Sequence, residues 1–296
     1  MRVTAKDIAE IVSVRVEHPE RIAELAAARV QPDGLVGSTG RLLLVAADHP
    51  ARGALRAGDD PLAMGDRAEL LSRMVRALER PGVDGVLGTA DVIEDLLLLG
   101  ALEGKVVIGS MNRGGLAGTD FEIDDKFTAY DAASIAAAGY QGGKMLFRID
   151  PRDPATPATM QACAEAVRDL ADHRVMAMVE PFISGRDAAG RLRNDLSTEA
   201  VVRSANVAAG LAPTSAYTWL KLPVVDNMEA VLAASTLPVV LLGGEVSADQ
   251  DAQFATWSKA LTSPTVRGMV VGRSLLFPPD GQVEDAVDAT VEMMTA

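Results

Sequence analysis

Short apolar runs alternate with segments of helical periodicity eight times along this chain of 296 residues, and this repeat most restricts the folds open to it. The apolar runs predict strands at Arg41–Ala47, Gly85–Gly88, Lys105–Ser110, Lys144–Ile149, Val175–Glu180, Thr218–Leu222, Pro238–Leu242 and Gly268–Val271. Uninterrupted apolar strands separated by helices are typical of a parallel sheet covered by helices. Eight such units predict an α/β protein, a (β/α)8 TIM barrel.

Helical periodicity between the strands is clearest at Met64–Leu78, Ala90–Leu99, Met160–Asp172, Thr198–Ala209 and Gln250–Leu261. A further pattern over Thr4–Arg29 predicts an extra helix before the first strand. We therefore expect one domain, with residues 1–40 as a helical extension and residues 41–296 as the barrel. A doubly wound open sheet is the alternative, but no G-x-G-x-x-G turn follows the first strand, where the chain reads Ala46-Ala47-Asp48-His49-Pro50.

The charge of the chain restricts its partners. A formal net charge of −13 disfavours nucleic acid and an anionic membrane as partners.

The sequence also indicates where the protein is located. No uncharged apolar run is long enough to span a bilayer, and Met1–Asp7 lacks the apolar core of a signal peptide. The single cysteine, Cys163, cannot form an internal disulfide. We expect a cytoplasmic protein.

Polar residues stand at or just beyond the ends of several predicted strands. In a TIM barrel these carboxyl ends gather the reactive groups at one mouth. The residues are Asp48, Asn112, Arg148, Glu180 and Lys221. Each also has an ordinary interpretation: Asp48 can cap a turn, Glu180 can be a solvated loop residue, and Arg148 can pair with Asp150.

Lys221 is the candidate for covalent chemistry. Period-two alternation places Tyr217, Trp219 and Lys221 on one strand face, so an indole and a phenol lie beneath the amine if that face points into the barrel. Desolvation lowers the pKa of such a lysine, and a neutral amine can attack a carbonyl to form a Schiff base. The same period aligns Asp48 and Glu180 with apolar residues of their own strands. The alternative is a lysine that reaches water from a strand end.

Two glycine-containing pairs, Gly243-Gly244 and Gly272-Arg273, follow the last two predicted strands. TIM barrels often bind phosphate at this position, and glycine lets backbone N–H groups approach an anion closely. The guanidinium of Arg273 adds a charge-assisted contact. We expect no metal site, because His49 alone of the three histidines lies near these residues.

Four stretches around the predicted strand ends match a known group of enzymes. They are Ala47–Leu55, Lys144–Pro151, Val179–Pro181 and Trp219–Val224. This pattern resembles the class I, Schiff-base aldolases with a (β/α)8 fold, and is similar to the tagatose-bisphosphate and sulfofructose-phosphate aldolases. It also resembles the deoxyribose-phosphate aldolases and deoxyribose-phosphate aldolase-like barrel proteins associated with inositol breakdown. One departure suggests a different substrate: those families usually have Asp-Gln-Arg-Gly, whereas three residues here separate Asp48 from Arg52.

The resemblance implies roles for individual residues. Lys221 would form the Schiff base, Glu180 would be an acid/base carboxylate, Asp48 would contact substrate hydroxyls or the imine, and Lys144 would be a supporting charge. The expected substrate- and phosphate-binding residues are Gly243, Gly244, Gly272, Arg273, Arg148 and Asn112.

The implied activity is that of a lyase without a cofactor. It would cleave or form a C–C bond in a phosphorylated ketose or keto-sugar acid and release dihydroxyacetone phosphate. A more specific expectation is 5-keto-2-deoxygluconate phosphate, split to dihydroxyacetone phosphate and malonate semialdehyde. We also expect a homo-oligomer.

Three alternatives remain open. The enzyme could instead be of the deoxyribose-phosphate type, or transaldolase-like with Lys144 as the nucleophile. Because Lys144 opens its predicted strand, we expect it deep in the barrel or at the opposite rim. A barrel isomerase or epimerase would use Asp48 and Glu180 without a covalent step. A phosphosugar-binding regulatory protein would keep the pocket without turnover.

Overall fold

Eight parallel strands close into a barrel in the computed structural model, which describes residues 1–37, 39–244 and 250–295. The barrel strands are β1 (Leu42–Ala46), β2 (Gly85–Gly88), β3 (Val106–Ser110), β4 (Gly142–Ile149), β5 (Met176–Arg186), β7 (Thr218–Leu222), β8 (Val239–Leu242) and β9 (Val266–Val271). They neighbour one another in this order, and β9 returns to pair with β1. The predicted (β/α)8 barrel is confirmed.

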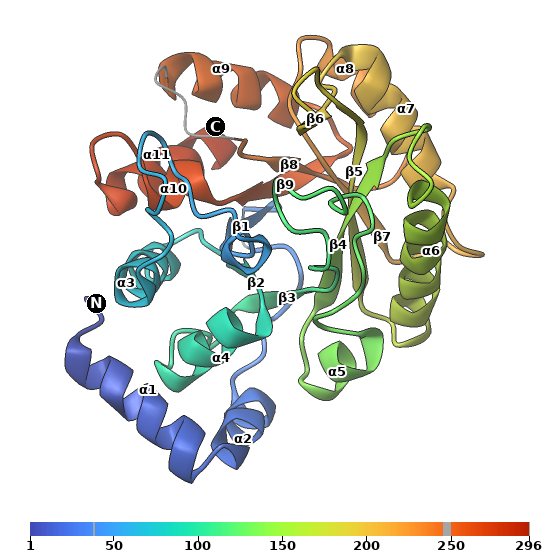
Figure 1. Cartoon of the computed structure of the whole chain (residues 1–296). Coiled ribbons are helices and arrows are strands. Elements are labelled where there is room, and N and C mark those ends of the chain that lie inside the picture. Colours follow the sequence, from blue (N-terminus) through green and yellow to red (C-terminus); the bar gives the residue numbers. More distant parts are fainter. Residues whose placement is uncertain (38, 245–249, 296) are drawn as a thin grey trace.

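Helices surround the barrel on its outer side (Figure 1). They are α1 (Ala5–Glu17), α2 (Glu20–Ala28), α3 (Arg67–Leu78), α4 (Ala90–Leu98), α5 (Ala132–Ala137), α6 (Thr156–Asp172), α7 (Thr198–Ala209), α8 (Met228–Leu232), α9 (Gln250–Leu261), α10 (Arg273–Leu276) and α11 (Val283–Thr295). The bounds of α7 and α9 agree with the sequence pattern. Among the described residues, no helix combines the length and the apolar character needed to cross a membrane.

The N-terminal extension is helical, as predicted, and the pattern over Thr4–Arg29 divides into two helices, α1 and α2. The break falls at Pro19, which has no N–H to continue the hydrogen-bond ladder and disfavours helical geometry in the residue before it. His18 accordingly leaves the helix with φ −143° and ψ 54°. Arg15 of α1 then pairs with two carboxylates of α4, at 2.9 Å each, and holds the extension against the outside of the barrel.

The barrel interior is filled by side chains that alternate along the strands. Its buried apolar members are Leu42, Leu44, Ala46, Leu87, Val106, Ile108, Met176, Met178, Val240 and Val270. The inward faces predicted for the first and fifth strands are therefore confirmed. Asp48 and Glu180 stand at the next inward positions of these two rows, at the carboxyl ends of the parallel strands.

The fourth barrel strand begins two residues earlier than the sequence pattern indicated. The predicted strand started at Lys144, after Gly142 and Gly143, and glycine generally weakens a strand. In the structure a Cβ at Gly142 would lie 2.6 Å from the carbonyl oxygen of Met176, so the close approach of β4 to β5 requires glycine there. Lys144 is therefore the third residue of its strand and not the first.

The fifth barrel strand continues six residues beyond its predicted end at Glu180. Proline has no N–H for a strand ladder, so Pro181 indicated an end that the structure does not have. Instead β5 pairs with β4 as far as Ile183, then turns back into the antiparallel strand β6 (Leu192–Asn194). This hairpin stands beside the mouth of the barrel, as Figure 1 shows at its upper edge.

Replacing Leu44 by alanine tests the inner core. Leu44 is fully buried, so we expect Leu44→Ala to lower the free energy of unfolding by about 2–5 kcal/mol, measured from urea midpoints. Val16 on α1 is 75% exposed, and Val16→Ala should change stability by less than about 0.5 kcal/mol. Equal effects of the two substitutions would contradict the packing described.

Candidate active site

A cavity of about 750 Å³ opens at the carboxyl ends of the barrel strands. Its lining contains the four residues predicted to be catalytic, Asp48, Lys144, Glu180 and Lys221. Asp48 follows β1, and the other three lie on β4, β5 and β7. Each is only 2–8% exposed, so four ionisable side chains share one buried site.

The buried charges are paired in a chain of short contacts. Lys144 lies between two carboxylates, with its Nζ 3.2 Å from Asp48 Oδ2 and 2.5 Å from Glu180 Oε2. Lys221 Nζ lies 2.8 Å from the other oxygen of Glu180. Glu180 therefore joins two lysines, one through each oxygen. Lys144 lies deep, as expected: it is 3% exposed and in register with Met178, two residues before Glu180 on β5. Its side chain nevertheless reaches the carboxylates at the mouth.

The two carboxylates are held in the ionised state. Burial by itself raises the pKa of Glu180, but Lys144 and Lys221 outweigh it and lower that pKa to about 2. Burial likewise opposes ionisation of Asp48, and Lys144 with Arg113 holds the pKa of that carboxyl well below its usual range. At neutral pH both groups are therefore negatively charged and accept hydrogen bonds.

The two lysines differ in their surroundings. Burial lowers the pKa of Lys144, against the opposing effect of its two carboxylate partners. Trp219 packs against the inner core beneath Lys221, as the alternation predicted. Tyr217 lies before β7 and is 36% exposed, so the predicted phenol does not cover the amine.

Two residues that contact Asp48 were not identified from the sequence. Arg113 places its Nη2 3.0 Å from Asp48 Oδ2 and also donates to the carbonyl oxygen of Asp48. Ser110, the last residue of β3, donates to the same carboxylate at 3.2 Å. Their positions in the sequence could have indicated them, because both residues stand at or just beyond the end of the third strand, next to the candidate Asn112.

Arg52 has a structural contact that accounts for the unusual sequence after β1. The side chain is buried and donates to the carbonyl oxygens of Asn112, at 2.7 Å, and Gly115, at 2.8 Å. It also pairs with Asp125 at 2.5 Å. Arg52 therefore holds the loop of residues 112–125 against the mouth.

Asn112 and Arg148, both expected to bind substrate, have different positions. Asn112 is fully buried and its amide exchanges two hydrogen bonds with the backbone of Leu146, so it joins β3 to β4 and does not line the cavity. Arg148 does line the cavity. Its partner is Glu122 from the loop of residues 112–125, and not Asp150 as the ordinary interpretation had it.

The four residues of the predicted anion site, Gly243, Gly244, Gly272 and Arg273, all line the cavity. The first two also have a reason of their own to be glycine. A Cβ at Gly243 would lie 2.4 Å from Val271 Cγ1, and Gly244 has a φ of 69°. Glycine at these positions therefore serves the backbone as well as any ligand.

His49 lines this side of the cavity, and Ser274 lies next to Gly243 without lining the cavity itself. Ser274 Oγ is buried without a hydrogen-bond partner among the described residues, and lies 3.0 Å from the place of a Cβ on Gly243. Burial lowers the pKa of His49 to about 4, so its imidazole is neutral at pH 7.

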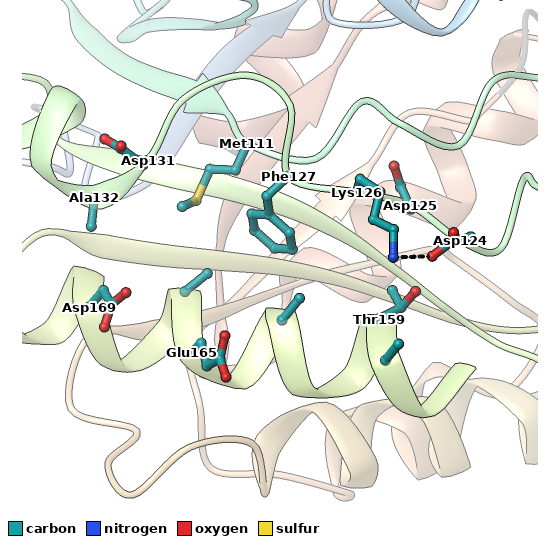
Figure 2. A pocket seen from close by; sticks show the side chains of 13 residues that line it. Met111, Asp124, Asp125, Lys126, Phe127, Asp131, Ala132, Thr159, Glu165 and Asp169 are labelled. Atoms are coloured by element: carbon teal, nitrogen blue, oxygen red, sulfur yellow. Dashed lines mark ion pairs between the residues drawn. The ribbon is translucent and has the colours of Figure 1, made fainter. Parts of the chain in front are cut away.

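A second cavity, of about 240 Å³, lies between the segment 124–132 and helix α6 (Figure 2). Its rim carries the carboxylates of Asp131, Glu165 and Asp169, and Lys126 there pairs with Asp124 at 2.8 Å. These carboxylates repel a phosphorylated ligand. The cavity at the barrel mouth, with its basic groups, is therefore the candidate active site.

The fold and this mouth define a TIM-barrel protein with a buried cluster of lysines and carboxylates. More particularly, the chain belongs to the Cgl0159-like family, whose model matches residues 40–291. The crystal structure of Cgl0159 from Corynebacterium glutamicum (Brevibacterium flavum) is 48% identical and has a TM-score of 0.95, over 99% of this chain and 98% of that one. No curated protein sequence matches significantly.

More distant solved structures share the fold. A Schiff-base-forming fructose-1,6-bisphosphate aldolase is 17% identical with a TM-score of 0.63, over 92% of this chain and 99% of that one. An archaeal fructose-1,6-bisphosphate aldolase, with its catalytic lysine bound to the carbinolamine intermediate, is 16% identical with a TM-score of 0.64, over 93% and 100% of the two chains. At this identity the likeness establishes a common barrel fold.

The depressed pKa of Glu180 predicts sensitivity to acid. Its contribution to the free energy of unfolding is fully present above the ordinary pKa of 4.5 and is lost as the pH falls toward 2. The urea midpoint of the wild type should therefore fall more steeply below pH 4.5 than that of Glu180→Gln. Glu24 is exposed on α2, and Glu24→Gln should follow the wild-type profile. Parallel profiles for the wild type and Glu180→Gln would contradict the assignment.

Proposed function

We propose that the protein is a class I aldolase in which Lys221 forms a Schiff base with a phosphorylated ketose or keto-sugar acid. The observation that carries this proposal is the buried amine of Lys221 at the cavity, 2.8 Å from the carboxylate of Glu180. A carboxylate at this distance can take the proton that the amine loses before it attacks a carbonyl. The shared barrel fold of Schiff-base aldolases supports the same chemistry.

Donor geometry favours Lys221 over Lys144 as the nucleophile. An ammonium has three N–H donors, whereas a protonated imine on the same nitrogen has one. Lys221 has one carboxylate partner among the described residues and keeps that contact as an iminium. Lys144 has two, Asp48 and Glu180, and would lose one. The lowered pKa of Lys144 supports the alternative, a transaldolase-like enzyme with Lys144 as nucleophile.

The reaction then runs through an iminium that withdraws electrons. The amine of Lys221 adds to the ketone, and loss of water gives the iminium. Glu180 accepts the proton of the hydroxyl beside the breaking C–C bond, whose electron pair moves to the nitrogen and leaves an enamine and an aldehyde. Protonation of the enamine and hydrolysis return the free lysine. Lys144 keeps the carboxylates ionised, and Asp48 contacts the substrate hydroxyls.

A phosphate on the substrate would bind at the far end of this cavity. Gly243, Gly244, Gly272 and Arg273 line it and would supply backbone N–H groups and a guanidinium. Binding there would fix the ketone against Lys221. The deoxyribose-phosphate-type and the non-catalytic phosphosugar-binding alternatives use the same site. Three expectations remain predictions. They are the family likeness to tagatose-bisphosphate and sulfofructose-phosphate aldolases, the release of dihydroxyacetone phosphate from 5-keto-2-deoxygluconate phosphate, and homo-oligomeric assembly.

Borohydride trapping tests the proposed nucleophile. Incubation with dihydroxyacetone phosphate and sodium borohydride should add one ligand mass to the peptide that contains Lys221, since reduction makes the imine permanent. Lys221→Ala should abolish labelling and cleavage. Lys221→Arg should fail equally, because a guanidinium stays protonated. Lys105→Ala, which removes a half-buried lysine just before β3, should label normally.

Each other outcome has a distinct meaning. Label on Lys144 would support the transaldolase-like alternative. Glu180→Gln should still label but turn over slowly, because it removes the proton acceptor and spares the amine. A protein that binds the ligand, as a rise in melting temperature, and yet gives no label would be a binding protein or a non-covalent isomerase.

Replacing Arg273 by alanine tests the phosphate site. A hydrogen bond to a charged group contributes about 1.5–3 kcal/mol, so Arg273→Ala should raise KM for a phosphorylated substrate about tenfold or more. For the unphosphorylated analogue KM should change little. An equal rise for both substrates would remove the phosphate assignment, and steady-state kinetics on both decide it.

A further inference from the structure

The cavity has two unlike sides. In a closed barrel of eight strands, strands four places apart face each other, so β5 lies across from β1 and β4 across from β9. The anion site follows β8 and β9, on one side of β7 and its Lys221, whereas β5 with the hairpin to β6, and β4 next to it, lie on the other side of β7. The two halves of a substrate held by Lys221 would therefore meet different surroundings.

The wall of β4, β5 and the hairpin presents apolar side chains to the cavity. Leu146 and Phe182 stand above Lys144 and Glu180 on their strands, and Leu192 and Leu196 come from the hairpin and the residues after it. Phe182 is 7% exposed, but Leu196 is 55% exposed. A leucine that borders a cavity and remains exposed has apolar surface left for a ligand to cover.

The basic groups of this wall already have anionic partners. Among its described lining residues, Arg148 pairs with Glu122, and both side chains are largely buried. Arg193 pairs with Asp187 at 3.1 Å. A phosphate that took Arg148 would displace Glu122 and leave a nearly buried carboxylate without its cation, which is strongly unfavourable. The wall therefore suits an uncharged, apolar group, and it disfavours the carboxylate end of the 5-keto-2-deoxygluconate phosphate expected from the sequence.

We propose, on the basis of the aldolase function above, that the aldehyde half of the substrate carries no phosphate and presents an aliphatic chain to Phe182, Leu192 and Leu196. In the direction of synthesis, the enamine on Lys221 attacks the aldehyde carbon, and its electron pair forms the new C–C bond. The aldehyde oxygen takes a proton and becomes a hydroxyl. Water then hydrolyses the iminium, which restores the lysine and leaves a ketose monophosphate with an apolar end.

Competing aldehydes test the proposal. A separate trapping experiment first shows that dihydroxyacetone phosphate forms a Schiff base with Lys221, and the untreated enzyme is then used for the kinetics. With this donor, kcat/KM for butanal should exceed that for glyceraldehyde 3-phosphate at least about tenfold, because one methylene in an apolar pocket is worth 10-fold or more. Unphosphorylated glyceraldehyde should fall between them. Equal or faster reaction of glyceraldehyde 3-phosphate would overturn the inference, whereas failure of the trapping would contradict the aldolase function itself.

Substitution of the exposed leucine tests the wall directly. Leu196→Asn, of similar size but polar, should lower kcat/KM for butanal about tenfold and should not lower it for glyceraldehyde 3-phosphate. Val16→Asn makes the same kind of change on α1, which Figure 1 shows on the other side of the molecule from β6, and should alter neither rate. An unchanged rate for butanal in Leu196→Asn would show that this wall does not contact the aldehyde.

Discussion

Glu180 holds two lysines, one with each carboxylate oxygen, and the arrangement of the barrel mouth depends on these ion pairs. Buried charges are stable only when partners satisfy them, so each member of the cluster restricts the position of the next. Lys144 extends the chain of contacts to Asp48, which Arg113 and Ser110 hold from β3 and the loop behind it. Two carboxylates thus face three basic side chains, and this local excess of basic groups suits an anionic substrate in a chain of net charge −13.

The pairing of buried charges also determines the structure around the cluster. Two buried ion pairs, Arg52 with Asp125 and Arg148 with Glu122, hold the loop of residues 112–125 at the mouth. Arg186 of the β5–β6 hairpin donates to the carbonyl oxygen of Asp120, so the loop and the hairpin are joined. Because Arg52 and Arg148 are paired with carboxylates, their guanidinium groups are not available to bind an anionic ligand. The cavity is consequently basic on one side and apolar on the other.

Most of the fold was predictable because the relevant signals are local. The alternation of apolar runs and helical periodicity predicted the barrel, and period-two alternation oriented Asp48, Glu180 and Lys221 correctly toward one mouth. Errors arose where glycine or proline serves a tertiary contact. Gly142 permits close strand approach, and Pro181 continues a strand, although each residue considered alone indicates a loop or an end.

The sequence by itself determined the number of barrel strands, which residues share a face with Asp48, Glu180 and Lys221, and that these three stand at strand ends, because backbone periodicity encodes such features directly. Only the tertiary structure decided which charges meet. Lys144 reaches Glu180, Arg52 reaches Asp125, and the Asn112 amide is used by the neighbouring strand, all across 34 to 73 residues of sequence. Such pairings follow from strand register and barrel closure, which no local pattern specifies.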